Sequence, residues 1–173
     1  PEEKITVIPN GIDLSKYSNL PPKGSFKKKF NLPENRKIIL YLGRIHKTKR
    51  IDLLIGAYAY LIKNKMCNDS ILTIAGPDDG YLDEAKFLIN SLGVSDSVLF
   101  TGLINSEDKL KALMDADLFV TPSFYGFPIT FLEACVVGTP IITTTLGDTL
   151  EWINGNVGYV TPPTYHDLAK AVY

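Results

Sequence analysis

Four cationic side chains lie within seven positions of one loop, residues 43–50. Arg44 directly follows an apolar run and Lys49 precedes an apolar-periodic segment, so both side chains can converge on one edge of a sheet. A planar guanidinium and a mobile ammonium group together suit a diphosphate. His46, between them, is expected to face solvent. A solvated basic turn is the alternative interpretation of these residues.

A second segment, residues 122–128, places a glycine-containing turn between an expected strand and an expected helix. Such a turn presents unpaired backbone N–H groups and the positive end of the helix to whatever lies above it. An anion or the hydroxyls of a sugar would fit there. Glu133 lies in the apolar helix that follows, where an unpaired carboxylate is costly to bury. This carboxylate therefore either pairs inside the protein or accepts hydrogen bonds from the hydroxyls of a ligand.

The elements that must position these residues alternate along the chain. Residues 38–42 form a continuous apolar run, which is typical of a strand buried on both faces of a parallel sheet. Residues 51–62 carry apolar side chains at three- and four-residue steps, which predicts a helix. Further strands are expected at residues 71–75, 98–101, 118–121, 140–144 and 158–161, and further helices at 83–92, 106–115, 129–137 and 165–173.

Strict alternation of strand and helix predicts an α/β fold, a doubly wound Rossmann-like parallel sheet of about six strands with helices on both faces. Ligands of such sheets bind beyond the carboxyl ends of the strands. Both segments with candidate chemistry begin at such ends.

Composition limits the function classes. The 173 residues are 45% hydrophobic and 21% charged, which is typical of one globular domain. The net charge of −1 argues against a nucleic-acid partner. No apolar run approaches the ~20 residues that span a bilayer, and the first residues show no signal-peptide pattern, so we expect a cytoplasmic protein. Cys67 and Cys135 are too few for a disulfide framework or a zinc site, and Cys135 is expected in the core.

The two ends of the chain differ from its middle. Residues 5–9 are expected to form a strand closed by the Asn10-Gly11 turn, and a polar stretch with Pro21, Pro22 and Gly24 indicates a linker, after which the core begins. We therefore expect residues 1–35 to be an interdomain linker strand with a connecting segment, and residues 36–173 to be the Rossmann-like domain. The last helical pattern stops without a cap, so we expect this domain to be truncated at its C-terminus.

Short motifs follow one another along almost the whole chain. They are residues 7–13, Gly43-Arg44 with Lys49, residues 72–76, 98–102 and 116–123, Gly126-Phe127, residues 132–134 and 138–140, and Gly147, Glu151, Gly155, Gly158 and Pro162. Each motif alone is weak, but their order and spacing are specific. Together they resemble the nucleotide-sugar-binding C-terminal domain of the retaining glycosyltransferases of family 4, which have the two-domain GT-B architecture.

The resemblance implies roles for individual residues. Arg44 and Lys49 would hold the donor diphosphate and be the main catalytic contributors. Glu133 would bind the ribose hydroxyls, and residues 101–103 would lie against the base. The implied nucleotide-binding residues are Gly43, Arg44, Lys49, Gly102, Leu103 and Glu133, and the implied sugar and phosphate loop is Tyr125, Gly126, Phe127, Pro128, Ile129 and Thr130.

The resemblance also implies an activity: retaining transfer of a hexosyl-type sugar from a nucleotide diphosphate sugar to an acceptor, in glycan, lipopolysaccharide or glycolipid synthesis. The acceptor would attack on the face that the diphosphate leaves, with a diphosphate oxygen helping to take the proton, so positioning and charge stabilisation would replace a side-chain base. No metal and no cofactor are expected.

The same resemblance implies that the chain is a fragment. GT-B catalysis takes place in a cleft between two domains, and an N-terminal acceptor domain is missing here, so the fragment is expected to be inactive alone. Any membrane association is expected only through that absent part, which would place the full-length protein at the cytoplasmic face of the membrane.

Three positions depart from the family pattern. Tyr125 occupies the place of the first of two glutamates, Pro128 stands where glycine is common, and Arg50 replaces the usual glycine after Lys49. Pro128 has no N–H to donate, although it suits a first helical turn. These departures leave open a catalytically inactive nucleotide-binding or scaffold domain derived from the same fold.

Other function classes fit less well. Asp115 and Asp117 have the Asp-x-Asp spacing of metal-dependent glycosyltransferases of another fold, but they bridge a helix and a strand. Asp78 and Asp79 lack the His or Cys neighbours that would define a metal site. No Gly-x-Gly-x-x-Gly follows the first strand, as nicotinamide binding would require. A receiver-type signalling domain would need an acidic cluster where this chain has a basic loop.

Overall fold

A computed structural model describes residue 6, residues 10–147 and residues 151–173. Within these residues a six-stranded parallel sheet has the order β3-β2-β1-β4-β5-β6. Its strands are β1 (Lys37–Leu42), β2 (Ser70–Ala75), β3 (Val98–Gly102), β4 (Leu118–Thr121), β5 (Ile141–Thr144) and β6 (Gly158–Thr161). The predicted doubly wound sheet is confirmed, and the strand order reverses between β1 and β4, where such sheets bind their ligands.

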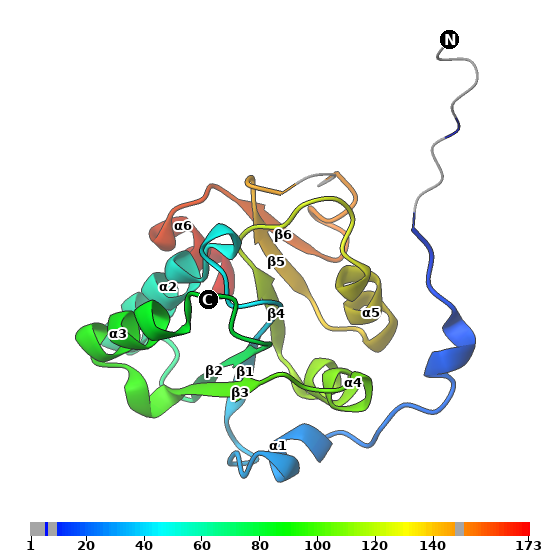
Figure 1. The fold of residues 1–173 in the computed structure, drawn as a ribbon, viewed down its shortest axis with the longest axis horizontal. Coiled ribbons are helices and arrows are strands. Elements are labelled where there is room, and N and C mark those ends of the chain that lie inside the picture. Colours follow the sequence, from blue (N-terminus) through cyan, green and yellow to red (C-terminus); the bar gives the residue numbers. More distant parts are fainter. Residues whose placement is uncertain (1–5, 7–9, 148–150) are drawn as a thin grey trace.

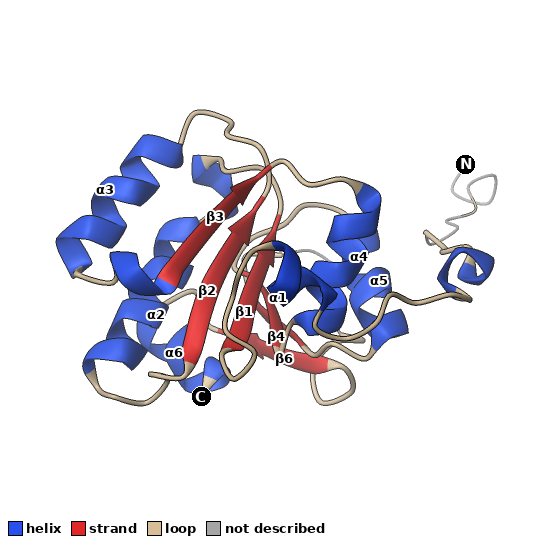
Figure 2. Cartoon of the chain, turned by 90° about the horizontal axis from the view of Figure 1, so that it is seen from below, coloured by secondary structure: helices blue, strands red, loops and turns tan. Residues whose placement is uncertain are grey.

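Helices cover both faces of the sheet (Figures 1 and 2). They are α1 (Ser25–Lys29), α2 (Ile51–Lys63), α3 (Leu82–Leu92), α4 (Ser106–Asp115), α5 (Ile129–Val137) and α6 (Tyr165–Val172). Side chains alternate along β1, so that Ile39 and Tyr41 pack toward α2, α3 and α6, while Ile38 and Leu40 pack toward α1, α4 and α5. This two-sided burial is why the apolar run of β1 is continuous.

The strands and the longer helices begin and end within two residues of their predicted positions. The expected strand at residues 5–9 lies outside the described residues except for Thr6, which belongs to no strand. The domain expected at residues 36–173 is preceded by a helix that shares its core. α1 forms inside the predicted linker, and its Phe26 is fully buried against α4, α5 and the sheet.

The carboxylate of Asp115, at the end of α4, explains why α1 forms at residues 25–29. This carboxylate is buried and accepts hydrogen bonds from the backbone N–H groups of Gly24, Phe26 and Lys27. These are donors that a helix start otherwise leaves without partners. Asp117 likewise accepts from the N–H of Ile38 at 2.8 Å. Both carboxylates of the Asp-x-Asp pair are therefore engaged with backbone N–H groups.

The loops after β1 and β2 are joined, which fixes the edge of the sheet that carries the basic loop. The N–H of Gly43 donates to Ala75, that of Ile45 to Pro77, and that of Asp79 to Ile45, all at 2.9 to 3.0 Å. A Cβ atom at Gly76 would lie 1.9 Å from the carbonyl oxygen of Gly43. Glycine at position 76 is therefore required for this close approach of two backbones.

Candidate functional site

Arg44 extends from the carboxyl end of β1 and is held by the loop that follows β2. Its Nη1 atom lies 2.6 Å from Oδ2 of Asp79. The buried Tyr41 hydroxyl donates to the carbonyl of Arg44 at 2.9 Å and so fixes the backbone beneath it. The Arg44 side chain is 63% exposed, which leaves guanidinium N–H groups accessible to an anion. An incoming anion would share Arg44 with Asp79 or displace that carboxylate.

Lys49 lies at the end of a short 3₁₀ turn, Lys47–Lys49, where it is partly buried. His46 caps this turn, because its Nδ1 accepts from the N–H of Thr48 at 3.3 Å. The Lys49 ammonium stands 5.7 Å from the centre of the Tyr125 ring. Burial lowers the pKa of Lys49, and the nearby positive charge of Arg44 lowers it further. An anion bound here would favour the charged ammonium again.

Arg44 and Lys49 share one cavity of about 230 Å³ at the reversal point of the sheet. Its wall consists of the ends of β1 and β4 and the loop that leads into α5. The lining residues are Tyr41, Leu42, Gly43, Arg44, Lys49, Phe119, Thr121, Ser123, Phe124, Tyr125, Pro128, Thr130 and Phe131. We call this the cationic cavity. Two cations converging on one cavity suit a doubly charged ligand group such as a diphosphate.

The start of α5 forms part of this wall. Pro128 directly precedes the helix with φ −69°, and its carbonyl accepts from the N–H of Phe131 at 3.1 Å. Gly126 has φ +65°, a left-handed conformation that favours glycine. The ring of Phe127 stacks on Trp152 with centroids 5.4 Å apart, and this contact helps to hold the loop at residues 122–128 in place. The positive end of α5 therefore contributes to the cationic cavity.

Glu133 lies one turn further along α5 and lines a different cavity, of about 500 Å³. We call this the Glu133 cavity. Its other lining residues come from the segment after Asn10 and from α4, namely Gly11, Ile12, Asp13, Lys16, Tyr17, Ser106, Glu107, Lys109, Leu110 and Leu113, together with Ile129 of α5. The Glu133 side chain is 9% exposed and pairs with Lys109, whose Nζ lies 2.5 Å from Oε1. The internal pairing considered for this carboxylate is therefore present.

The two cavities flank the first turn of α5. Pro128 and Thr130 line the cationic cavity, whereas Ile129 lines the Glu133 cavity. Of the predicted site residues, Gly102, Leu103, Gly126 and Phe127 line neither cavity. Leu103 is 77% exposed in the loop that leads from β3 to α4.

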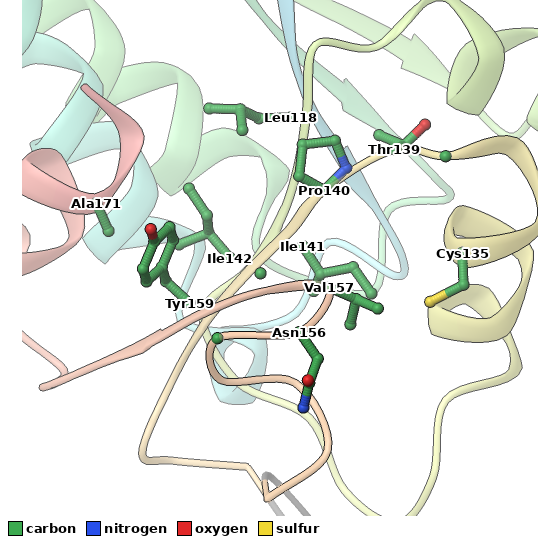
Figure 3. Close-up of a pocket in the computed structure, with 13 residues that line it drawn as sticks. Leu118, Cys135, Thr139, Pro140, Ile141, Ile142, Asn156, Val157, Tyr159 and Ala171 are labelled. Atoms are coloured by element: carbon green, nitrogen blue, oxygen red, sulfur yellow. The ribbon is translucent and has the colours of Figure 1, made fainter.

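A third cavity, of about 580 Å³, lies at the opposite edge of the sheet, at the amino ends of β4, β5 and β6 (Figure 3). Its lining carries no charged side chain and includes Pro140, Val157 and Tyr159. Cys135, expected in the core, is only partly buried: near the end of α5 it packs against the core cluster that contains Phe131 and also lines this cavity. The cavity lacks the ionic groups of the other two.

In the described part of the chain, no helix is long and apolar enough to cross a membrane. Across residues 10–147 and 151–173, with Thr6, no three His, Cys, Asp or Glu side chains gather as metal ligands would.

Three residues of the site were not predicted from the sequence: Asp79, Lys109 and Tyr17. Asp79 follows a strand end next to that of Arg44, so the parallel sheet itself was a signal for their pairing. Lys109 and Tyr17 contact Glu133 from α4 and from the segment before α1. No periodicity in the sequence indicates how those two segments pack on α5.

Comparison with known proteins gives the family of the chain. The sequence profile of glycosyl transferases group 1 matches residues 22–173. An uncharacterised glycosyltransferase of Methanocaldococcus jannaschii, MJ1607, is 34% identical over 99% of this chain and 45% of its own length. The chain thus spans about half the length of this curated relative.

Solved structures share the fold. WaaG, a glycosyltransferase involved in lipopolysaccharide biosynthesis, superposes with a TM-score of 0.84 at 24% identity, over 99% of this chain and 47% of that one. Anabaena Alr3699/HepE, solved in complex with UDP and glucose, gives a TM-score of 0.82 at 22% identity, over 98% of this chain and 47% of that one.

Proposed function

The chain belongs to the glycosyl transferases group 1 family and has the fold of a GT-B C-terminal domain, and from this premise we propose that it binds the nucleotide sugar donor of a retaining glycosyltransferase. The observation that carries the proposal is the convergence of Arg44 and Lys49 on one cavity at the reversal point of the sheet. There the two cations would hold the donor diphosphate.

The donor would lie across the first turn of α5. The diphosphate would occupy the cationic cavity, and the nucleoside would extend into the Glu133 cavity, whose volume is in the usual range for small-molecule sites. Glu133 would accept hydrogen bonds from ribose hydroxyls. Contacts of Gly102 and Leu103 with the base stay a prediction. These residues lie where β3 ends and the loop to α4 begins.

The proposed chemistry is same-face transfer of the sugar. The bond between the anomeric carbon and the diphosphate oxygen breaks, the acceptor hydroxyl forms the new bond on that face, and its proton passes to a diphosphate oxygen. Negative charge develops on the leaving diphosphate, and Arg44, Lys49 and the start of α5 stabilise it. The scheme uses no metal and no cofactor.

The acceptor would bind elsewhere in a longer protein. The chain matches about 45% of its curated relative, so we propose that the remaining half supplies the acceptor-binding domain and that this fragment alone transfers no sugar. The link of WaaG with lipopolysaccharide suggests a glycan or glycolipid product.

A catalytically inactive binding domain is the second candidate. Tyr125, 68% exposed beside Lys49, offers a phenol where the family resemblance implies a carboxylate, and Pro128 lacks an N–H. Both changes would face the sugar rather than the nucleotide. Nucleotide binding is common to both candidates.

A ligand screen by calorimetry tests the proposal. UDP, GDP, ADP, their sugar conjugates, NAD and the matching monophosphates are titrated into the chain. We expect one nucleoside diphosphate to bind at one site, at least about tenfold tighter than its monophosphate, because the second phosphate adds charge-assisted contacts. Preference for NAD, or equal affinity for monophosphate and diphosphate, would overturn it.

A further inference from the structure

The two oxygens of the Glu133 carboxylate have different surroundings. Oε1 lies 2.5 Å from Nζ of Lys109 and accepts a second hydrogen bond from the Tyr17 hydroxyl at 3.1 Å. Oε2 is buried and has no hydrogen-bond partner among the described residues. A buried acceptor without a partner raises the free energy of this arrangement, so a rearrangement that gives both oxygens partners is favoured.

The two donors to Oε1 differ in how they are held. Lys109 belongs to the ten-residue helix α4, which packs on α5 and the sheet. Tyr17 closes the short 3₁₀ turn Leu14–Tyr17, none of whose residues is buried, and the Asp13 side chain caps that turn. Displacing Tyr17 from Glu133 therefore exposes no core side chain, whereas displacing Lys109 breaks the ion pair of a carboxylate that is only 9% exposed.

The Tyr17 hydroxyl has the chemistry of a ligand hydroxyl. It donates one hydrogen bond to a carboxylate oxygen at the wall of the Glu133 cavity, as a sugar hydroxyl would. Burial raises the pKa of Tyr17, and the Glu133 carboxylate raises it further, so the hydroxyl keeps the proton that it donates.

We propose that Tyr17 is an internal competitor for the hydroxyl-binding carboxylate of Glu133, and that Lys109 is the residue that positions this carboxylate. The inference rests on the proposed function, since the displacing group is a ribose hydroxyl of the donor. When the donor binds, one ribose hydroxyl replaces Tyr17 on Oε1 of Glu133 and the neighbouring hydroxyl donates to Oε2, while the ion pair with Lys109 stays in place.

The test uses two variants that remove the two partners of the same oxygen, Tyr17→Phe and Lys109→Met. Calorimetry compares UDP with 2′,3′-dideoxyuridine diphosphate, which lacks the ribose hydroxyls. We expect Tyr17→Phe to bind UDP about threefold to tenfold more tightly than wild type, and Lys109→Met to bind it at least about tenfold more weakly. Neither change should alter the affinity for the dideoxy compound.

The opposite signs separate this inference from a merely structural role, which would weaken binding in both variants. Lys111→Met is the matched control, because Lys111 lies on α4 but pairs with Glu107 and Asp108, and it should leave both affinities unchanged. Lys109→Arg should restore the preference for UDP over the dideoxy compound that Lys109→Met loses. Weaker or unchanged UDP binding by Tyr17→Phe, or equal effects on both compounds, overturns the inference alone. If wild type binds none of UDP, GDP and ADP, the proposed function is overturned and this inference with it; if it binds GDP or ADP instead, that nucleotide and its dideoxy analogue take the place of UDP in the comparison.

Discussion

At the scale of single residues, the site depends on charges that are held in place but incompletely neutralised. Arg44 pairs with the carboxylate of Asp79, and both side chains are substantially exposed, so their pairing is worth little in water. A diphosphate carries more negative charge than Asp79 and can bind Arg44 and Lys49 at the same time. Asp79 thus orients Arg44 without blocking an anion.

The lowered pKa of Lys49 predicts a pH dependence of nucleotide binding. Burial favours the neutral amine, so Lys49 loses its proton at a lower pH than the usual 10.5. The affinity for UDP should therefore fall as pH rises toward that value. Lys49→Arg stays charged there, because a guanidinium does not deprotonate in proteins.

Calorimetry at about pH 7.5 and about pH 9.5 measures this difference, and wild type should lose more affinity than Lys49→Arg between the two pH values. Groups that titrate in both proteins cancel in the comparison. Parallel losses would contradict the role of the Lys49 charge.

The presence of Tyr125 leads to a prediction about how much of the affinity for the donor comes from the nucleotide and how much from the sugar. A phenol replaces a carboxylate acceptor there, and Pro128 donates no N–H, so the sugar finds fewer partners. Wild type should bind the glucose conjugate of UDP less than about tenfold tighter than UDP itself, a difference below about 1.4 kcal/mol.

Tyr125→Glu is expected to raise that preference by about threefold to tenfold, because it supplies an acceptor for sugar hydroxyls. UDP alone, titrated into both proteins, accounts for the added charge. A wild-type preference already above about tenfold would show that the sugar subsite has lost nothing.

At the scale of elements, backbone geometry decides where these side chains stand. Arg50, which replaces the glycine usual in the family resemblance, has φ +52° and ψ +40° at the start of α2. This left-handed conformation costs about 1 to 2 kcal/mol for a residue with a Cβ atom. The Arg50 guanidinium donates to both carboxylate oxygens of Asp52, at 3.0 to 3.2 Å, and offsets part of that cost.

The attachment of α1 to α4 gives a stability prediction. Asp115→Ala removes the acceptor of three N–H groups at the start of α1, and Phe26 beside them is fully buried. We expect a loss of about 3 kcal/mol in the free energy of unfolding, because buried donors are left unpaired. Urea denaturation measures it. The exposed Asp96→Ala is the control, with a change within about 0.5 kcal/mol, and an equal effect of both variants would contradict the assigned role.

The elements also show what the sequence could predict. The run at residues 38–42 identified β1 because both faces of the sheet are covered. The three- and four-residue steps identified α2 because they place apolar side chains on the face of that helix that packs on the sheet. α1 was not predicted, because Pro21, Pro22 and Gly24 are typical of a linker. The carboxylate that stabilises its start is about ninety residues away, and no local pattern reports it.

At the scale of the whole molecule, the sheet topology creates the site. Alternation of strands and helices predicted a parallel sheet, and with it that Arg44 and the loop at residues 122–128 lie at one edge. Only the observed order, with β1 beside β4, makes them neighbours. The separation of Glu133 into its own cavity depends on how α4 and the segment before α1 pack on α5. That packing is set by side-chain fit, which a single sequence does not reveal.

Direct titration of the nucleotide against two matched variants tests the central claim, that a nucleoside diphosphate binds through the cationic cavity. Arg44→Ala removes a cation that lines the cavity, and Lys47→Ala removes an exposed cation of the same loop that does not line it. Calorimetry with UDP should show at least about a tenfold weaker affinity for Arg44→Ala and a change within about twofold for Lys47→Ala. An unchanged dissociation constant in Arg44→Ala, or equal losses in the two variants, would contradict the account.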